Sequence, residues 1–152
     1  MRVDVALSTI HRLYVETAPL IYYIELHSRY LPIMDIVVAA IDSASIQAES
    51  SVITLVEVLS HPLQQGNLQL ANDYRNILVH SGAFQIIPVT VDIAEQAARL
   101  RARYNLRTPD ALHIATALER GCDAILTNDV AFKRVEELQV LLLDNLENPT
   151  SA

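Results

Sequence analysis

The strongest constraint on the fold is an alternation of short β-prone runs with longer segments of helical periodicity. Strands are predicted over residues 12–16, 51–54, 84–89, 123–127 and 139–143. Helices are predicted over residues 17–29, 33–48, from the second strand through 59, and over 67–80, 90–104 and 108–120. Strands that alternate with helices predict an α/β fold, in which a parallel sheet carries helices on both faces with right-handed crossovers.

Threonine, proline and glycine mark the expected helix ends. Thr17 and Pro19 supply an N-cap and an early proline for the helix after the first strand. Thr108-Pro109-Asp110 is typical of another helix start, with threonine as the cap, proline at the first position and an acid in the first turn. Pro62 is expected to stop the helix that follows the second strand, and Gly121 the helix before the fourth.

The composition predicts one domain over residues 1–152. The chain is 51% hydrophobic, which is enough apolar material for a continuous core, and its three glycines form no linker. Aromatic residues make up 5% and tryptophan is absent, so leucine, isoleucine, valine and alanine must build the core. The first ten residues and the tail after 145 carry no clear pattern, and we expect them to be peripheral.

The charge balance excludes a protein that coats nucleic acid by bulk electrostatics. The net charge is -7, whereas such binding needs a basic surface, so any phosphate binding must be local. The single cysteine, Cys122, cannot form an internal disulfide, and it opens an apolar run that predicts a buried thiol. No charged leader and no apolar stretch of ~20 residues is found, so we expect a cytoplasmic protein outside the membrane.

Four acids occupy points where a strand passes into a helix or where a helix begins: Glu16, Glu57, Asp110 and Asp129. The carboxyl ends of parallel strands meet at one edge of a sheet, so acids that are distant in the chain can converge there. Two carboxylates ~5 Å apart repel by about 3 kcal/mol at an effective dielectric constant near 20, and a divalent cation offsets that repulsion. Oxygen ligands without a cysteine and histidine cluster favour Mg²⁺ or Mn²⁺ over zinc.

Each of these residues also has a purely structural explanation. Glu57 fits a solvated helix face, and Asp110 fits a favourable anion in a first turn. Asn128-Asp129 fits an ordinary turn, and Glu16 fits a partner of a surface arginine. His113, three residues after Asp110, fits a packed or hydrogen-bonded histidine better than a ligand, and it is given no primary role.

Three segments with their neighbours resemble the PIN-domain family, and within it the VapC-type ribonuclease toxins of toxin-antitoxin pairs. The most specific is TPDALHIATALERGCDAILTND over residues 108–129. RLYVETAPLIYYIE over 12–25 is similar to the first motif of the family, and SSVITLVEVLSHP over 50–62 to the segment with the helical glutamate. The order and spacing of the three agree with the family over nearly the whole chain.

The resemblance implies a three-layer α/β/α fold with a parallel sheet of order 3-2-1-4-5. It also implies that the four acids bind one or two Mg²⁺ or Mn²⁺ ions, and that a metal-activated water attacks an RNA phosphodiester to leave 5′-phosphate and 3′-hydroxyl ends. Thr17, Thr127 and Asn128 would support the acidic side chains, the last two by hydrogen bonds.

The chain departs from the family pattern at two places. The family usually has aspartate where this chain has Glu16, whose extra methylene moves the carboxylate, and Ala18-Pro19 replaces a polar residue after the first motif. An alternative is therefore a catalytically weak or inactive PIN-like module that binds RNA or a protein. A phosphoryl-transfer enzyme or phospho-receiver is disfavoured, because no Asp-x-Asp motif follows the first strand and the lone lysine is not on the last strand.

Basic side chains near the acids are candidates for phosphate binding. Lys133 is the only lysine and stands beside Arg134 just after Asp129, while Arg107 precedes Asp110. Taken singly, each is better explained as a solvated side chain, and together they would supply local positive charge. The resemblance implies a homodimer and a small antitoxin that lies in a groove near the acids. The apolar side chains of the first two helices belong either to such an interface or to the core: Leu20, Ile21, Tyr23, Ile24, Ile36, Val37, Ala40 and Ile41.

Overall fold

A computed structural model describes residues 1–150 of the chain. Its centre is one sheet of five strands in the order β3-β2-β1-β4-β5, and each neighbouring pair is parallel. The strands are β1 (Arg12–Val15), β2 (Gln47–Ser51), β3 (Phe84–Ile87), β4 (Ala124–Thr127) and β5 (Gln139–Leu142). The predicted α/β class and the strand order 3-2-1-4-5 are confirmed.

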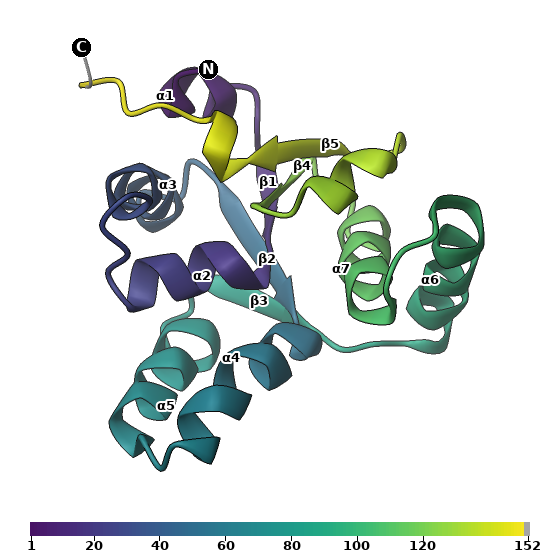
Figure 1. The fold of residues 1–152 in the computed structure, drawn as a ribbon. Helices are drawn as coiled ribbons and strands as arrows, with labels where there is room; N and C mark the ends of the chain where they lie inside the picture. Colours follow the sequence, from purple (N-terminus) through teal and green to yellow (C-terminus); the bar gives the residue numbers. More distant parts are fainter. Residues whose placement is uncertain (151–152) are drawn as a thin grey trace.

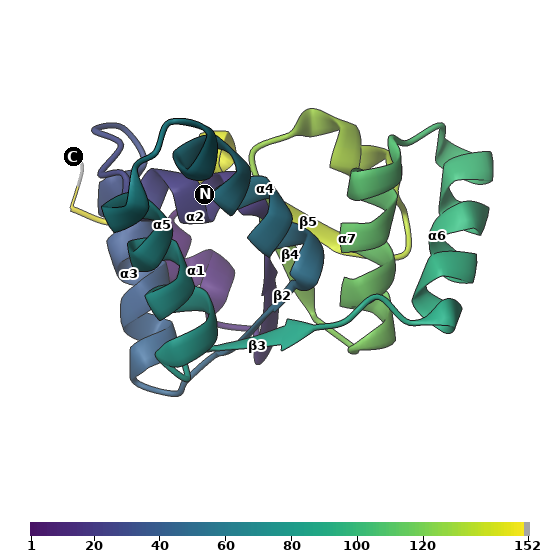
Figure 2. The same ribbon diagram turned by 90° about the horizontal axis from the view of Figure 1, so that it is seen from below.

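Helices cover both faces of the sheet (Figures 1 and 2). They are α1 (Val3–Leu7), α2 (Thr17–Ile24), α3 (Leu31–Asp42), α4 (Val52–Gln64), α5 (Leu68–Arg75), α6 (Val91–Tyr104) and α7 (Thr108–Glu119), with shorter turns η1 (Asn76–His80), η2 (Val130–Arg134) and η3 (Leu143–Asn145). Leu13 and Val15 of β1 join the core under α1 to α5, whereas Tyr14 between them joins the core under α6 and α7. This alternation is the period of a strand buried on both faces, and it produces the predicted three layers.

The second strand lies earlier than predicted. β2 covers Gln47–Ser51 instead of 51–54, and α3 ends at Asp42 instead of running to 48, because Ala44 has a positive φ of 61°. Glu49, Ser50 and Ser51 are buried in this strand, where Ser50 donates a 2.8 Å hydrogen bond to the Val15 carbonyl. Ser51 then caps α4 by accepting a hydrogen bond from the Ile53 amide.

Other helix ends also differ from the prediction. α2 stops at Ile24 instead of 29, because Leu26 adopts a left-handed φ of 57°. α4 continues through Pro62 to Gln64, although the proline was expected to stop the helix. Pro62 therefore lies in the last turn of α4, which ends two residues later. The helix predicted over 67–80 is α5 followed by a π-helical turn, η1.

The two ends of the described chain are part of the core. The amide of Val3 donates a 2.9 Å hydrogen bond to the Glu147 carbonyl, and Arg2 and Glu147 form a parallel bridge. The segments that we expected to be peripheral therefore contribute buried apolar side chains: Val3, Ala6, Leu7, Ile10 and Leu146.

The long helix α7 connects the two edges of the sheet. Its last turn reaches the amino edge, where Arg120 makes two hydrogen bonds of 2.6 and 3.0 Å to the buried carboxylate of Glu49. Its first turns lie at the carboxyl edge, where Asp110 and His113 are found. Within residues 1–150, no helix has both the length and the apolar character that crossing a bilayer requires.

Candidate metal centre at the carboxyl edge of the sheet

Glu16 is the first residue after β1 and the N-cap of α2. Its Oε2 atom accepts hydrogen bonds from the Ala18 amide at 3.3 Å and from the Thr127 hydroxyl at 3.1 Å. The residue is only 8% exposed, and this burial raises the pKa of the Glu16 carboxyl, although the nearby His113 opposes the shift. Burial thus makes the ionised form of Glu16 costlier than it is in water, and a cation beside the carboxylate would offset that cost.

Glu57 extends from the second turn of α4 toward the same place. Its Oε1 atom accepts a 2.9 Å hydrogen bond from the Thr17 hydroxyl and lies 2.6 Å from Nε2 of His113. Burial alone would raise the pKa of Glu57, but the hydrogen bond and charge of His113, followed by Thr17 and Arg107, outweigh it and lower the pKa. Glu57 is therefore ionised at neutral pH.

His113 is fully buried between these groups. Its Nδ1 lies 2.6 Å from the Tyr14 hydroxyl, and its Nε2 lies 4.0 Å from Oε1 of Glu16 in addition to its contact with Glu57. No primary role was predicted for this histidine, and the one signal that could have found it is its place one helical turn after Asp110.

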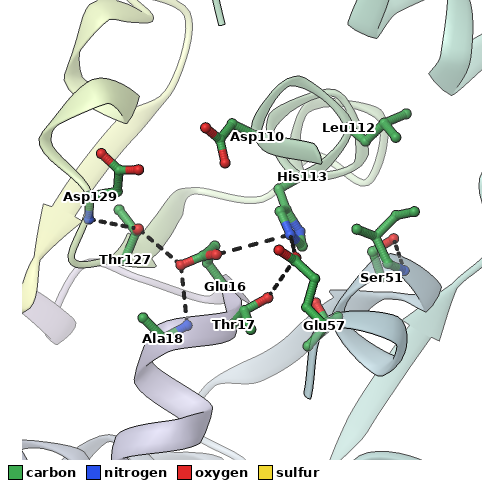
Figure 3. A network of polar contacts seen from close by, with 12 residues as sticks. Glu16, Thr17, Ala18, Ser51, Glu57, Asp110, Leu112, His113, Thr127 and Asp129 are labelled. Atoms are coloured by element: carbon green, nitrogen blue, oxygen red, sulfur yellow. Dashed lines mark hydrogen bonds and ion pairs between the residues drawn. The ribbon is translucent and has the colours of Figure 1, made fainter. Parts of the chain in front are cut away.

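Glu16, Glu57 and His113 form the one group within residues 1–150 whose ligand atoms all lie within 4.8 Å of one another, close enough to share a metal ion (Figure 3). Each carboxylate has one oxygen that accepts two hydrogen bonds and one that accepts none from the described residues: Oε1 of Glu16 and Oε2 of Glu57. In the same part of the chain no fully buried side-chain oxygen or nitrogen lacks a partner, so these two oxygens reach solvent.

Asp110 lies in the first turn of α7, beside this group and outside it. Both of its oxygens accept hydrogen bonds from Arg107, at 3.0 and 3.2 Å. The Asp110 side chain is 6% exposed and that of Arg107 is 72% exposed, so the arginine covers the carboxylate from the solvent side. The pKa of Arg107 is raised, first by Asp110 and further by the charges of Asp129 and Glu57, which shows that its guanidinium lies in the field of three acids.

Asp129 is the N-cap of η2, and its Oδ1 accepts a 2.9 Å hydrogen bond from the Ala131 amide. Thr127 links it to Glu16, because the Thr127 hydroxyl donates to Glu16 and accepts a 3.1 Å hydrogen bond from the Asp129 amide. Asn128 is directed elsewhere, since its Oδ1 accepts from the Asp144 amide at 3.0 Å and so joins β4 to η3.

The basic residues after Asp129 lie on the surface. Lys133 and Arg134 are exposed on η2, and Arg134 donates a 3.1 Å hydrogen bond to the Asn105 carbonyl. Among the three predicted phosphate contacts, Arg107 is therefore the one that the structure pairs with a predicted site acid.

The donor set fits a hard divalent cation. The oxygens of Glu16 and Glu57 that have no hydrogen bond face the shared region, and Oδ2 of Asp129 accepts no hydrogen bond from residues 1–150 either. Asp110 is the fourth candidate ligand, and Arg107 already neutralises its charge. Carboxylate oxygens of this kind suit Mg²⁺ or Mn²⁺, and the nitrogen of His113 would be tolerated by Mn²⁺ better than by Mg²⁺.

Comparison with known proteins supports one family. The family model described as the PIN domain matches residues 13–138. No curated protein sequence matches the chain. Solved structures with a similar fold include VapBC2 from Rickettsia felis bound to a promoter DNA fragment, which is 17% identical with a TM-score of 0.70 over 86% of this chain and 98% of that one.

Two further structures are similar over most of their length. A toxin-antitoxin complex from Klebsiella pneumoniae is 25% identical, with a TM-score of 0.63 over 86% of this chain and 97% of that one. VapC20 from Mycobacterium tuberculosis, described as a toxin that cleaves the sarcin-ricin loop, is 18% identical, with a TM-score of 0.67 over 80% of this chain and 92% of that one. At such low identity these likenesses establish the fold.

Proposed function

Because the chain belongs to the PIN domain family, whose members are generally nucleases, we propose that it is a Mg²⁺- or Mn²⁺-dependent endoribonuclease that acts as the toxin of a toxin-antitoxin pair. The observation that carries this proposal is the pair of solvent-facing carboxylate oxygens on Glu16 and Glu57, whose other oxygens are each fixed by two donors. An arrangement that fixes acids with one oxygen free serves a cation better than it serves folding, because like charges at short range destabilise the chain that holds them.

The four acids have separate tasks in this proposal. Glu16, Glu57 and Asp129 would hold the cation through their free oxygens, and Asp110 would join them when Arg107 leaves it. When bound, Mg²⁺ or Mn²⁺ supplies charge stabilisation to a phosphate and lowers the pKa of a bound water. Thr17 and Thr127 keep Glu57 and Glu16 in place by hydrogen bonds, whereas Asn128 acts indirectly, by holding the end of β4 against η3.

RNA is the proposed substrate, and local positive charge must attract it because the whole chain carries a net charge of -7. Arg107 is exposed and lies beside the acids, so its guanidinium can exchange Asp110 for a phosphate oxygen by a small movement of the side chain. Lys133 and Arg134 on η2 would contact the RNA backbone further along. The similar structure that cleaves the sarcin-ricin loop makes a structured RNA the first substrate to try.

The proposed protein partners are a small antitoxin and a second copy of the chain. Similar structures are toxin-antitoxin complexes. Of the apolar residues of α2 and α3, Leu20, Val37 and Ile41 are buried in the core, whereas Tyr23 and Ile24 are partly exposed. With Leu26, which is 69% exposed, these two line a hollow of about 380 Å³ between α2, α3 and η1, and an antitoxin helix would cover such a surface.

A cytoplasmic location belongs to the same proposal. A cytoplasmic RNA would be within reach there, and Cys122 is a free thiol that is buried. Burial raises the pKa of Cys122 to about 12, so the thiol is inert and needs no oxidising compartment.

Cleavage of a structured RNA by the purified chain tests the proposal. Activity with Mg²⁺ or Mn²⁺ should disappear in EDTA and in the variants Glu57→Gln and Asp110→Asn. Exposed acids supply matched controls, Glu119→Gln on α7 and Asp42→Asn on α3, which should remain active. Cleavage that persists in the site variants would contradict the proposal, and cation binding without any cleavage would favour the alternative of an inactive binding module.

A further inference from the structure

Tyr14, His113 and Glu57 are linked by two short contacts, which connect the sheet to α4 through α7. Tyr14 comes from β1, His113 from α7 and Glu57 from α4. Both contacts of the His113 ring are 2.6 Å long, one at each nitrogen. Tyr14 and His113 are both completely buried, so their contact is shielded from water, whereas the contact of His113 with Glu57 is partly buried.

The Tyr14 end of this series of contacts is rigid. The Tyr14 and His113 rings meet edge to face, with centroids 5.7 Å apart and an angle of 65° between their planes. Tyr14 is packed in the core under α6 and α7, so it holds the imidazole plane in one orientation. With Nδ1 fixed in this way, Nε2 can point only toward the carboxyl edge, where it meets Oε1 of Glu57.

At the Glu57 end, the two carboxylate oxygens have different surroundings. Oε1 accepts from both the Thr17 hydroxyl and His113, while Oε2 accepts no hydrogen bond from residues 1–150. Because a carboxylate only accepts, Nε2 of His113 must carry the proton in this contact. A glutamate on a helix has three free side-chain torsions, and two donors on one oxygen stop the carboxylate from rotating.

We propose that His113, oriented by Tyr14, is a positioning residue that occupies Oε1 of Glu57 and thereby presents Oε2 to the cation. The inference rests on the proposed function, because the cation is part of that proposal. It assigns His113 an indirect role: the imidazole acts through Glu57 and keeps its own Nε2 engaged. The alternative of direct ligation would require Nε2 to give up a 2.6 Å contact that it already makes.

A matched pair of amide substitutions separates positioning from packing. Glutamine places its side-chain nitrogen near the position of Nε2 and keeps a donor for Glu57, whereas asparagine reaches only the position of Nδ1 and loses that donor. Both remove the same buried ring. Loss of a partner that orients a metal ligand typically lowers metal affinity by about 10- to 100-fold, so His113→Asn should bind Mn²⁺ that much more weakly while His113→Gln keeps most of the affinity.

Calorimetric titration of the full chain with Mn²⁺ alone gives the readout, with thermal unfolding in EDTA as the check on folding. Equal Mn²⁺ affinities for the two amide variants would overturn the inference, because a structural role affects both alike. If neither folds, Tyr14→Phe decides: it keeps the ring packing and frees Nδ1, so weaker Mn²⁺ binding is expected and wild-type affinity contradicts the role. Failure of the wild-type chain to bind Mn²⁺ would instead refute the proposed function itself.

Discussion

At the scale of single residues, Arg107 and a bound cation would compete for the same oxygens. Both oxygens of Asp110 are hydrogen-bonded to Arg107, and the positive charge of the arginine also lies in the field of Asp129 and Glu57. A cation that recruits Asp110 therefore competes with an ion pair whose arginine is exposed to solvent and whose strength is modest for that reason.

Replacement of Arg107 by glutamine should have opposite effects on two ligands. Mn²⁺ affinity should rise by roughly two- to five-fold, the range expected from an ion pair with a solvated arginine, because Asp110 no longer has a competing partner. RNA affinity measured in EDTA should fall, because a phosphate contact is lost. Arg99→Gln is the matched control, since Arg99 is an exposed arginine on α6 whose ion pair is with Glu95. Equal effects in both variants would mean that only net charge matters.

Burial of Glu16 predicts how the stability of the metal-free chain depends on pH. The folded pKa of Glu16 is raised above its usual value of 4.5, so between these two pKa values the folded chain holds more protons than the unfolded chain. The free energy of unfolding should therefore fall as pH rises through that window. Glu16→Gln removes this contribution.

Denaturant unfolding in EDTA across a pH series measures the effect. The wild-type chain should lose stability from pH 4.5 upward relative to Glu16→Gln, until the folded carboxyl is ionised. Parallel profiles for the two proteins would show that Glu16 titrates normally and that its burial imposes no penalty.

The sequence located the acids but not their partners. Glu16 and Asp129 could be placed because both follow strands that neighbour each other in the sheet. The contact between His113 and Glu57 depends on how α4 and α7 cross at the carboxyl edge, and such packing is not encoded in spacing along one helix. The pairing of Arg107 with Asp110 had a local signal, three residues at a helix start, but the same signal equally fits a phosphate ligand.

At the scale of elements, α7 joins the candidate site to an ion pair at the opposite edge. The carboxylate of Glu49 is 2% exposed and meets Arg120 of the α7 C-cap, with Arg12 of β1 at 3.4 Å. A buried acid that loses its partner destabilises a fold by about 3–5 kcal/mol, and this value is reduced here because Arg120 is partly solvated and Arg12 remains.

Arg120→Leu should therefore cost about 2 kcal/mol of unfolding free energy, a discounted value for a partly exposed partner. Mn²⁺ affinity should be unchanged, because the site lies at the other end of the helix. Arg103→Leu is the control, since Arg103 pairs with Glu136 and Glu137 on the surface. A loss of Mn²⁺ affinity in Arg120→Leu at intact stability would show that α7 transmits strain between the edges.

The position of β2 shows why some elements escaped prediction. Its sequence, QAESS, lacks β-branched and aromatic residues, and glutamine, alanine and glutamate favour helices. What makes it a strand is the tertiary environment: the ion pair of Glu49, and the hydrogen bond of Ser50 to the neighbouring strand. The strands β1, β4 and β5 were predicted within a residue or two because their own apolar runs specify them.

At the scale of the whole molecule, the ends of the described chain close the fold together. The amino group of Met1 donates to the Asn145 carbonyl at 3.0 Å, and α1 covers the core beside α3. Alternation predicted the parallel α/β class and the family resemblance implied the strand order. This closure was not predicted, because α1 is only five residues long and has no periodicity to detect.

Two alanine substitutions in α1 test this closure. Leu7 is 7% exposed, so Leu7→Ala should cost about 2 kcal/mol or more of unfolding free energy by denaturant titration. Val5 is 53% exposed on the same helix, and Val5→Ala should change stability by less than about 0.5 kcal/mol. A loss of stability in Leu7→Ala as small as that in Val5→Ala would mean that α1 adds nothing to the core.

In the proposed function, acids from separate elements share one cation at the carboxyl edge of the sheet. An anomalous difference map from a crystal of the chain soaked in Mn²⁺ tests it most directly. The expected result is a peak about 2.1 Å from both Glu16 Oε1 and Glu57 Oε2, the distance typical of hard cations and their oxygen ligands. The peak should be absent in Glu57→Gln. A map at saturating Mn²⁺ with no peak there, or with peaks only elsewhere on the surface, would contradict the claim.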